Sequence, residues 1–453
     1  MRNLRDKISN IACGVALLSG CCVPVMAASS LDAMLGSKTP YLPQQSALSY
    51  ERPPEGFVIE GLQLVARHGS RGLTKPGPDE RLLKVLREAH EQQGLEPAGE
   101  KLLSAVERFI RAQREVGYGN LSALGEQEQQ QLARRAVARL PGLFEVGAVP
   151  HVLLQSSGVD RAVDSARNFA SAMGEAAPQL KLPSQPETDR FLLYFHKLRT
   201  GGEGADTPER QLTLRRSLAY QQWLRSPQLE AEQRRIDADP RLRDAAVAGL
   251  KPLFTAEYLD RHAEQLQDWG KDLMELRGAA AGLRLEMGFD FGRFLSAEQA
   301  AVFNEHDDAE DFYRKGPGLS EAGDVPFAIA GQLLDTLFAG LDGSEPRVRL
   351  RFAHAEIVAP LVSRIGISGI HRPQPQARPY AWAINPWRSS TVIPMAANVQ
   401  WELWRGPQDE RLVRMLLNER EADFVPACEA ARWRPGSHFY RVQALRACYD
   451  GLK

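Results

Sequence analysis

Residues 57–71 read Phe-Val-Ile-Glu-Gly-Leu-Gln-Leu-Val-Ala-Arg-His-Gly-Ser-Arg, and this stretch decides the fold class of the chain. Its first ten residues are mostly apolar and rich in branched side chains, which predicts a buried strand over 57–66. The composition turns polar and basic at Arg67, and a glycine follows two residues later, which predicts a loop directly after the strand. In an α/β sheet, ligands bind at such loops, beyond the carboxyl ends of the strands.

Two later segments repeat this arrangement of a strand followed by polar residues. A short apolar run at 151–155 precedes Ser156-Ser157-Gly158-Val159-Asp160-Arg161. Another run at 348–353 precedes His354-Ala355-Glu356, and a helical pattern follows over 357–365. Because the carboxyl ends of parallel strands meet at one edge of a sheet, we expect these three loops to converge.

The residue types in these loops suit the binding of an anion. Guanidinium groups at Arg67, Arg71 and Arg161 match phosphate or carboxylate oxygens in a bidentate manner. An imidazole held among cations has a lowered pKa, which would keep His68 neutral and nucleophilic. His354 can donate to a phosphate oxygen, and a carboxyl group at Glu356 can hold a proton for a leaving group.

Each of these motifs also has an ordinary structural interpretation. Residues 67–71 could form a basic surface turn, and Arg161 alone could be a solvated charge. Glu356 could cap a helix beside a histidine whose hydrogen bonds are satisfied within the fold. Their shared position at strand ends is what favours a functional site.

The rest of the chain predicts a two-part organisation. Residues 205–312 are rich in Leu, Ala, Arg and Glu and predict almost continuous helix, whereas strand patterns return at 348–353, 391–393 and 413–417. We therefore expect an α/β domain over 28–200 and 321–453, with a mostly helical domain inserted over 201–320.

Composition excludes several classes of protein. The 453 residues carry 56 Lys and Arg against 57 Asp and Glu, which argues against binding nucleic acid through a general positive charge. The content of hydrophobic residues (43%) and charged residues (25%) is that of a globular protein. Beyond the N-terminal segment no apolar run approaches the ~18 residues of a membrane-spanning helix.

The N-terminus has the pattern of a bacterial export signal. Three basic residues within the first seven precede an apolar run over 11–20. Cleavage after Ala27 would give a segment 1–27 of the ordinary kind. Alternatively, Leu18-Ser19-Gly20-Cys21 resembles a lipobox, in which case residues 1–20 are removed and Cys21 is lipidated. The expected location is the periplasm or, with a lipid anchor, the outer membrane of a Gram-negative-type bacterium.

Two of the five cysteines belong to the body of the protein. Cys428 and Cys448 lie 20 positions apart, and in an exported chain this favours a disulfide over two separate buried thiols. A zinc site is disfavoured because no CxxC or HExxH spacing accompanies the pair.

Taken together, these motifs resemble a known family. Arg67-His68-Gly69-Ser70-Arg71 followed by Thr74 is similar to the RHGxRxxT signature of histidine acid phosphatases, the second branch of the histidine phosphatase superfamily. His354-Ala355-Glu356 resembles the variant of the distal motif found in multiple inositol polyphosphate phosphatases, a group of phytases. Shorter similarities are at 121–125, 161–169, 313–316, 396–398 and 418–420. Residues 191–196 depart from the group, which often has an Asp and a Cys there.

The resemblance implies a fold and a role for each matching residue. The fold would be a phosphoglycerate-mutase-like central sheet flanked by helices. His68 would be the nucleophile, Glu356 the proton donor, and Arg67, Arg71, Arg161 and His354 the phosphate ligands, with Thr74 and Lys315 lining the wider pocket. The expected substrate is phytate, hydrolysed stepwise by a monomer that needs no cofactor or metal and binds no nucleic acid. Alternatives are a broad acid phosphatase acting on sugar phosphates or nucleotides, and a non-catalytic polyanion-binding lipoprotein.

Overall fold

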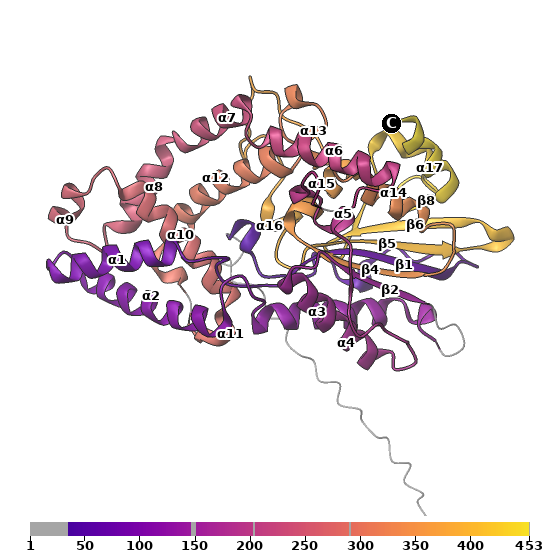
Figure 1. The fold of residues 1–453 in the computed structure, drawn as a ribbon, viewed down its shortest axis with the longest axis horizontal. Coiled ribbons are helices and arrows are strands. Elements are labelled where there is room, and N and C mark those ends of the chain that lie inside the picture. Colours follow the sequence, from indigo (N-terminus) through magenta and orange to yellow (C-terminus); the bar gives the residue numbers. More distant parts are fainter. Residues whose placement is uncertain (1–34, 146–150, 203, 290, 453) are drawn as a thin grey trace, which may run out of the picture.

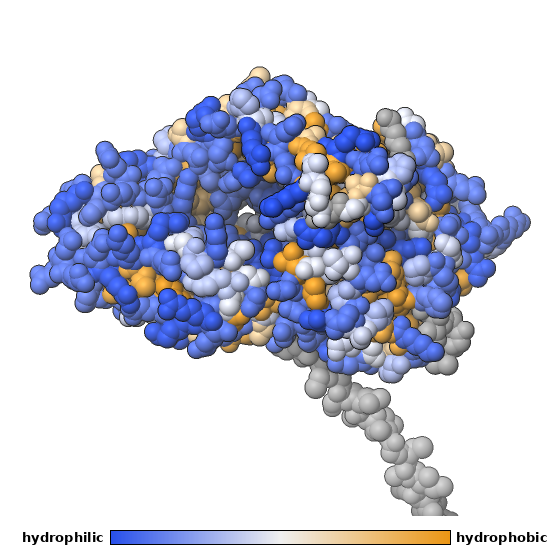
Figure 2. Space-filling view, viewed as in Figure 1, coloured by the Kyte–Doolittle hydropathy of each residue, from blue (hydrophilic) through white to orange (hydrophobic). Residues whose placement is uncertain are grey.

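A computed structural model of the protein describes residues 35–145, 151–202, 204–289 and 291–452. The molecule has two lobes, one built on a mixed sheet and one made of helices (Figure 1). The face shown in Figure 2 is mostly hydrophilic and is hollowed between the two lobes. The expected signal segment and Cys21 lie outside the described residues.

Within the described residues the sheet has eight strands in the order β3-β2-β4-β1-β5-β6-β7, with β8 paired to β6. The first four strands in this order are parallel to one another, whereas β5 to β8 pair in an antiparallel manner. The bounds are β1 Val58–Arg67, β2 Val152–Ser156, β3 Glu187–Thr188, β4 Val348–Ala353, β5 Asn398–Arg405, β6 Arg411–Leu417, β7 Arg420–Ala422 and β8 Phe439–Arg441.

The side chains of β1 are divided between two hydrophobic cores because alternate residues of a strand face opposite sides of the sheet. Leu62, Leu64 and Ala66 pack with residues of the helices α3 (Ala123–Arg139) and α4 (Asp160–Ala176) below the sheet in Figure 1. Val65 belongs to the core on the other face. That face is covered by α5 Arg190–Leu193, α6 Pro208–Trp223, α13 Val325–Ala328, α14 Gly331–Ala339, α15 Ala355–Ile365 and α17 Val442–Gly451.

The helical lobe has a hydrophobic core of its own, contributed by two separate stretches of the chain. The first stretch, between β1 and β2, is α1 Pro78–Glu91 and α2 Pro97–Val116. The second, between β3 and β4, is α8 Pro240–Leu250, α9 Ala256–Arg261, α10 Leu266–Gly282, α11 Arg284–Met287 and the first half of α12 Ala297–Lys315. The helix α7 Pro227–Asp237 and the second half of α12 pack instead with the core of the sheet lobe. The domain boundaries expected at 201 and 320 stay a prediction. The core of the helical lobe also includes residues between 82 and 112, which precede the first boundary. The helix α6, which follows that boundary, packs on the sheet lobe.

Two local predictions are corrected by the structure. Residues 391–393 do not form a strand, because Ser389–Val392 is a single helical turn, α16. The strand β5 was not predicted, although its sequence Asn-Val-Gln-Trp-Glu-Leu-Trp-Arg alternates apolar and polar residues. All but the last of its residues are buried, since β1 and β6 lie on either side.

The expected disulfide is present between Cys428 and Cys448, whose Cα atoms lie 5.7 Å apart. It joins the 3-10 helix Pro426–Ala431 to α17. Among the described residues no helix has both the length and the apolar character that crossing a membrane requires.

Candidate active site

Three loops meet at the carboxyl edge of the parallel strands, next to the helical lobe. The register pairs Arg67 with Ala353, and Phe352 with Ser156, so β1, β4 and β2 end at the same level. The first residue after β1 is His68, whose backbone N–H donates to the carbonyl oxygen of Ala353 at 2.9 Å. The neighbouring strands β1 and β4 thus bring together residues that are nearly 300 positions apart in the sequence.

His68 is held in one tautomer. Its Nδ1 atom lies 2.9 Å from the carbonyl oxygen of Gly69, and because a carbonyl only accepts, Nδ1 carries the proton. The other nitrogen, Nε2, therefore has a free lone pair. Burial, together with the charges of Arg67, Arg71 and Arg161, lowers the pKa of His68 well below its usual value. The ring is thus neutral, as the sequence predicted.

Three arginines surround His68 with donors that have no protein partner. Nη1 of Arg67 donates to the carbonyl oxygens of Ser37 (2.5 Å) and Ile393 (2.6 Å), which fixes the group at the edge of the sheet. The Nε atoms of Arg67, Arg71 and Arg161 are all buried, with no hydrogen-bond partner among the described residues. Buried donors without a partner are costly, so this arrangement is complementary to an anion.

His354 lies next to His68, with the ring centroids 5.5 Å apart. Its Nε2 atom is 2.9 Å from the hydroxyl oxygen of Ser157, whereas Nδ1 is buried with no partner among the described residues. Burial and the charge of Arg161 lower the pKa of His354 well below the usual value. A neutral His354 can present an N–H to the same anion through Nδ1 when Ser157 donates to Nε2.

Glu356 occupies the first turn of α15, two residues after His354. Burial by itself would raise the pKa of its carboxyl group, but the opposing charges around it, of which Lys315 is the largest, lower the pKa well below the usual value. Lys315 lies on α12, where its Nζ atom is 2.7 Å from a carboxylate oxygen of Asp311. The site without substrate therefore favours an ionised Glu356, so protonation requires acidic conditions or added negative charge.

Tight packing behind the loop that follows β1, residues 68–71, explains why position 69 is a glycine. A Cβ atom at Gly69 would lie 2.3 Å from the carbonyl oxygen of Gly125, and one at Gly125 would lie 2.2 Å from the carbonyl oxygen of Ser70. The buried carboxylate of Glu128 accepts from the backbone N–H (2.6 Å) and hydroxyl (2.7 Å) of Ser70. Gly69 thus permits close contact between this loop and α3.

The structure brings most of the predicted residues together but not all of them. Arg67, His68, Arg71, Arg161, His354 and Glu356 cluster at the sheet edge, and Lys315 reaches the same region from α12. Thr74 is exposed and lies near Gly119, on the loop before α1. Within the described chain no hydrogen bond joins the Thr74 side chain to this cluster.

Several residues of the site were not predicted from the sequence. His196 and Tyr194 lie beside His354, with ring centroids 6.2 Å and 5.5 Å from it, in the segment where the sequence departs from the family. Residues 37 and 38, which precede β1, also contact this region. The carbonyl oxygen of Ser37 accepts a hydrogen bond from Arg67, and Lys38 forms an ion pair with Glu275 of α10 at 2.6 Å. A sequence pattern gives little indication of such residues, because they belong to irregular segments.

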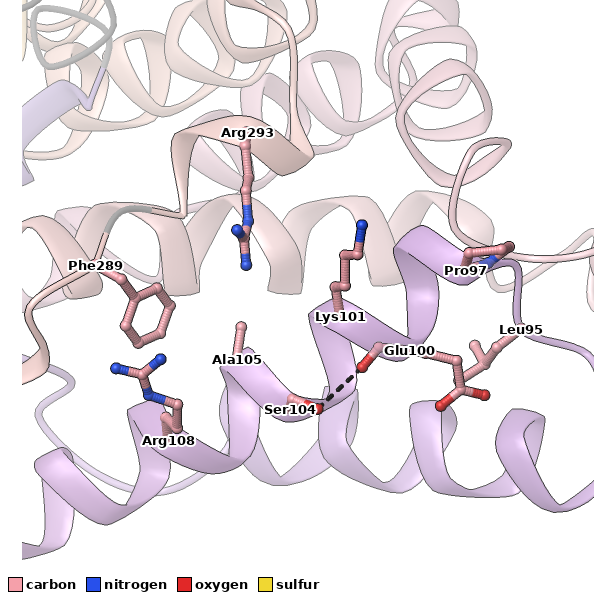
Figure 3. Close-up of a pocket in the computed structure, with 9 residues that line it drawn as sticks. All are labelled: Leu95, Pro97, Glu100, Lys101, Ser104, Ala105, Arg108, Phe289 and Arg293. Atoms are coloured by element: carbon pink, nitrogen blue, oxygen red, sulfur yellow. Dashed lines mark hydrogen bonds between the residues drawn. The ribbon is translucent and has the colours of Figure 1, made fainter.

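A second hollow, of about 620 Å³, lies on the helical lobe between α2 and the segment after α11 (Figure 3). Lys101, Arg108 and Arg293 line it, but all three are exposed, and Arg108 stacks on Phe289 with its guanidinium carbon 4.4 Å from the ring centroid. The carboxylate of Glu100 points away from Arg293 in Figure 3 and contacts His90. This hollow has no histidine in its wall, which makes the sheet edge the better candidate.

A metal-dependent arrangement is not evident in this region. Among the described residues there is no group of three or more His, Cys, Asp or Glu side chains placed to hold a metal ion. The charges around His68 are instead the guanidinium groups of Arg67, Arg71 and Arg161. Arginine can supply the neutralisation of phosphoryl oxygens that Mg²⁺ supplies in other enzymes.

A neutral histidine ringed by arginines at the carboxyl edge of an α/β sheet defines a class of phosphatase. The sequence model of the histidine phosphatase superfamily (branch 2) matches residues 58–418, and the chain belongs to this family. It is accordingly a hydrolase of phosphomonoesters.

Several individual proteins are similar to this chain in sequence or in structure. The chain is 23% identical over 346 residues to multiple inositol polyphosphate phosphatase 1 of Gallus gallus, covering 73% of this chain and 70% of that protein. The multiple inositol polyphosphate phosphatase of Bifidobacterium longum, solved with phosphate, is 26% identical, with a TM-score of 0.84 over 92% of this chain and 97% of that one. The same enzyme with inositol hexasulfate gives a TM-score of 0.81 over the same coverage. The phytase of D. castellii, 15% identical with a TM-score of 0.62, shares the fold over 93% of this chain and 85% of that one.

Proposed function

We propose that this protein removes phosphate groups stepwise from inositol polyphosphates such as phytate, through a phosphohistidine formed on His68. The observation that carries the proposal is the convergence of three unpartnered arginine Nε atoms and Nδ1 of His354 around a neutral His68. Relatives named for inositol polyphosphates support the substrate class.

In the first step, Nε2 of His68 attacks the phosphorus atom, and the bond from phosphorus to the ester oxygen breaks. The arginines and His354 hold the equatorial oxygens, on which the negative charge of the transition state is spread. Glu356 donates its proton to the departing inositol oxygen, which is a poor leaving group as an alkoxide. The products of this step are a free hydroxyl group and phosphohistidine.

In the second step, water attacks the phosphohistidine and the phosphorus–nitrogen bond breaks. Glu356, now ionised, accepts a proton from the water, so inorganic phosphate leaves and the site returns to its starting state. A substrate with several phosphates also brings negative charge close to Glu356. Such charge opposes the effect of Lys315 on the carboxyl pKa and favours the protonated form that the first step needs.

The test is phosphate release from phytate by the wild type and by His68→Ala, each with and without a chelator. Release by the wild type in the presence of chelator, with none from the variant, is the expected result. Absence of release from phytate, while glucose phosphate is hydrolysed, would favour the broad acid phosphatase instead.

We further propose that the protein is exported and acts as a monomer, either free in the periplasm or anchored through a lipid on Cys21. The leader pattern and the disulfide between Cys428 and Cys448 support export. Incorporation of labelled palmitate into the wild type but not into Cys21→Ser would establish the anchor. Lack of label in both would favour cleavage after Ala27.

A further inference from the structure

His196 lies in a short segment that is firmly held against the sheet lobe. The segment is the 3-10 helix Phe195–Lys197, which follows α5. The hydroxyl of Ser217 on α6 donates to the carbonyl oxygen of Phe195 at 2.5 Å, and the side chain of Gln221 donates to that of Leu198 at 2.8 Å. The position of the His196 ring is therefore fixed by backbone contacts on both sides of it.

The ring of His196 borders the proposed phosphate site. Its centroid is 4.8 Å from that of Tyr194 and 6.2 Å from that of His354, and the Tyr194 and His354 centroids are 5.5 Å apart. Glu356, Lys315 and Arg161 all influence the charge of His196, which places the ring within their electrostatic reach. His196 thus lies beside His354 and close to the charges of Glu356 and Lys315.

The polar atoms of His196 are not used by the fold. The side chain is almost fully buried, and Nδ1 is completely so, yet neither ring nitrogen forms a hydrogen bond with another described residue. Burial is the main cause that lowers the pKa of His196 to about 4, so the ring is neutral and carries one N–H donor. An apolar ring would fill the same space without the cost of an unsatisfied donor, which indicates a role toward a ligand.

We infer that His196 donates a hydrogen bond to a second phosphate group of the substrate, next to the one attacked by His68. The inference rests on the proposed function, because it requires a substrate with more than one phosphate. Lys315, at the C-terminal end of α12, and His196, on the 3-10 helix Phe195–Lys197, would then contact the same neighbouring phosphate. His196 is a specificity-determining residue in this arrangement and takes no part in the bond changes at phosphorus.

The experiment compares a ligand carrying several anionic groups with a substrate carrying one. p-Nitrophenyl phosphate serves as substrate, and myo-inositol hexasulfate, which has no phosphate to release, serves as competitor. In His196→Leu the inhibition constant of the hexasulfate should rise about tenfold, the loss expected for one hydrogen bond to a charged group. The KM for p-nitrophenyl phosphate should rise by a clearly smaller factor.

Two further variants keep the result interpretable. His196→Asn retains an N–H donor and should recover most of the affinity for hexasulfate, even if the leucine variant folds poorly. His371→Leu removes a histidine whose Nδ1 donates to Ile367 beyond the far end of α15, and it should leave both constants unchanged. The thermal unfolding midpoint of each variant is measured alongside.

An unchanged inhibition constant in His196→Leu, or equal losses for hexasulfate and p-nitrophenyl phosphate, would overturn the inference. Failure of the proposed function gives a different pattern, namely a wild type that hydrolyses p-nitrophenyl phosphate but releases nothing from phytate. The competition measurement does not depend on phytate turnover, so the two failures are distinguishable.

Discussion

Nδ1 of His68 lies 2.9 Å from the carbonyl oxygen of Gly69, and this single contact determines which ring nitrogen can attack phosphorus. Because the proton is held on Nδ1, the lone pair is on Nε2 at every pH at which the ring is neutral. The lowered pKa of His68 extends that range into acid. In the mechanism proposed above, Nε2 of His68 is therefore available for attack before any substrate binds.

The first prediction concerns the covalent intermediate. Rapid acid-free quenching with denaturant after mixing with ³²P-labelled phytate should trap a labelled protein that is stable to alkali and labile to acid, as a phosphoramidate is. His68→Ala should carry no label and should lose turnover by on the order of 10⁴-fold or more, since no other described group replaces the nucleophile. Label retained in the variant would assign the phosphoryl acceptor to another residue.

The second prediction tests the proposed role of Glu356 as proton donor by comparing two substrates whose leaving groups differ in their need for a proton. Glu356→Gln keeps the shape of the side chain but cannot donate a carboxyl proton. Hydrolysis of phytate should fall by about 10²- to 10⁴-fold, whereas hydrolysis of p-nitrophenyl phosphate, whose leaving group is stable as an anion, should fall much less. Equal losses on the two substrates would remove Glu356 from the role of acid.

The third prediction concerns pH. The acid form of Glu356 is the active one in the first step, so kcat/KM for phytate should decline as pH rises above the carboxyl pKa. Lys315 lowers that pKa, and Lys315→Gln should therefore move the declining limb toward higher pH. The pH profile for p-nitrophenyl phosphate should move less.

Lys101→Gln is the matched control for the pH measurement, because Lys101 lies in the hollow on the helical lobe, away from His68. It should leave the profile in place. A limb that stays in place or moves to lower pH in Lys315→Gln would show that Lys315 does not govern the proton of Glu356.

The fourth prediction concerns the contact between the nucleophile loop and α3. In Gly69→Ala the added methyl group would meet the backbone of Gly125 at 2.3 Å, and backbone cannot move aside as a flexible side chain can. The substitution should lower the free energy of unfolding by about 1–3 kcal/mol, measured by chemical denaturation, and reduce turnover through displacement of His68. Gly204→Ala, where a Cβ would meet nothing within 4 Å, should be neutral.

The fifth prediction concerns the disulfide. Reduction, or the double substitution Cys428→Ala with Cys448→Ala, should destabilise the protein by about 3 kcal/mol in the chain-entropy estimate for a loop of this length. The midpoint of thermal unfolding should depend on reductant in the wild type but not in the double variant. The bond joins elements distant from the sheet edge, so kcat/KM at low temperature should be unaffected.

Local sequence patterns predicted the three strands that precede the candidate site residues. The strand patterns before Arg67, Arg161 and His354 correspond to β1, β2 and β4. The first two are largely apolar, whereas the third, Val-Arg-Leu-Arg-Phe-Ala, begins with apolar and basic residues in alternation. The run at 391–393 is also apolar, yet it lies in the single turn α16, since three residues are too few to distinguish a strand from a helical turn.

Residues outside the strand ends could not be assigned in this way. His196 enters the site through a 3-10 helix with no periodic pattern, and Ser37 contributes only its backbone carbonyl oxygen, which any residue type would supply. Likewise α1 and α2 have the amphipathic pattern of helices on a sheet, but nothing in that pattern tells which apolar surface they cover. Such assignments depend on tertiary contacts.

Both stretches of the helical lobe are inserted between parallel strands, one after β1 and one after β3, and these strands end at the edge of the sheet where the candidate site lies. Insertions and replacements there can accumulate without altering strand pairing or the hydrophobic layers beneath. During divergence from a common ancestor, such a scaffold lets substrate range change quickly while the reaction itself is inherited intact.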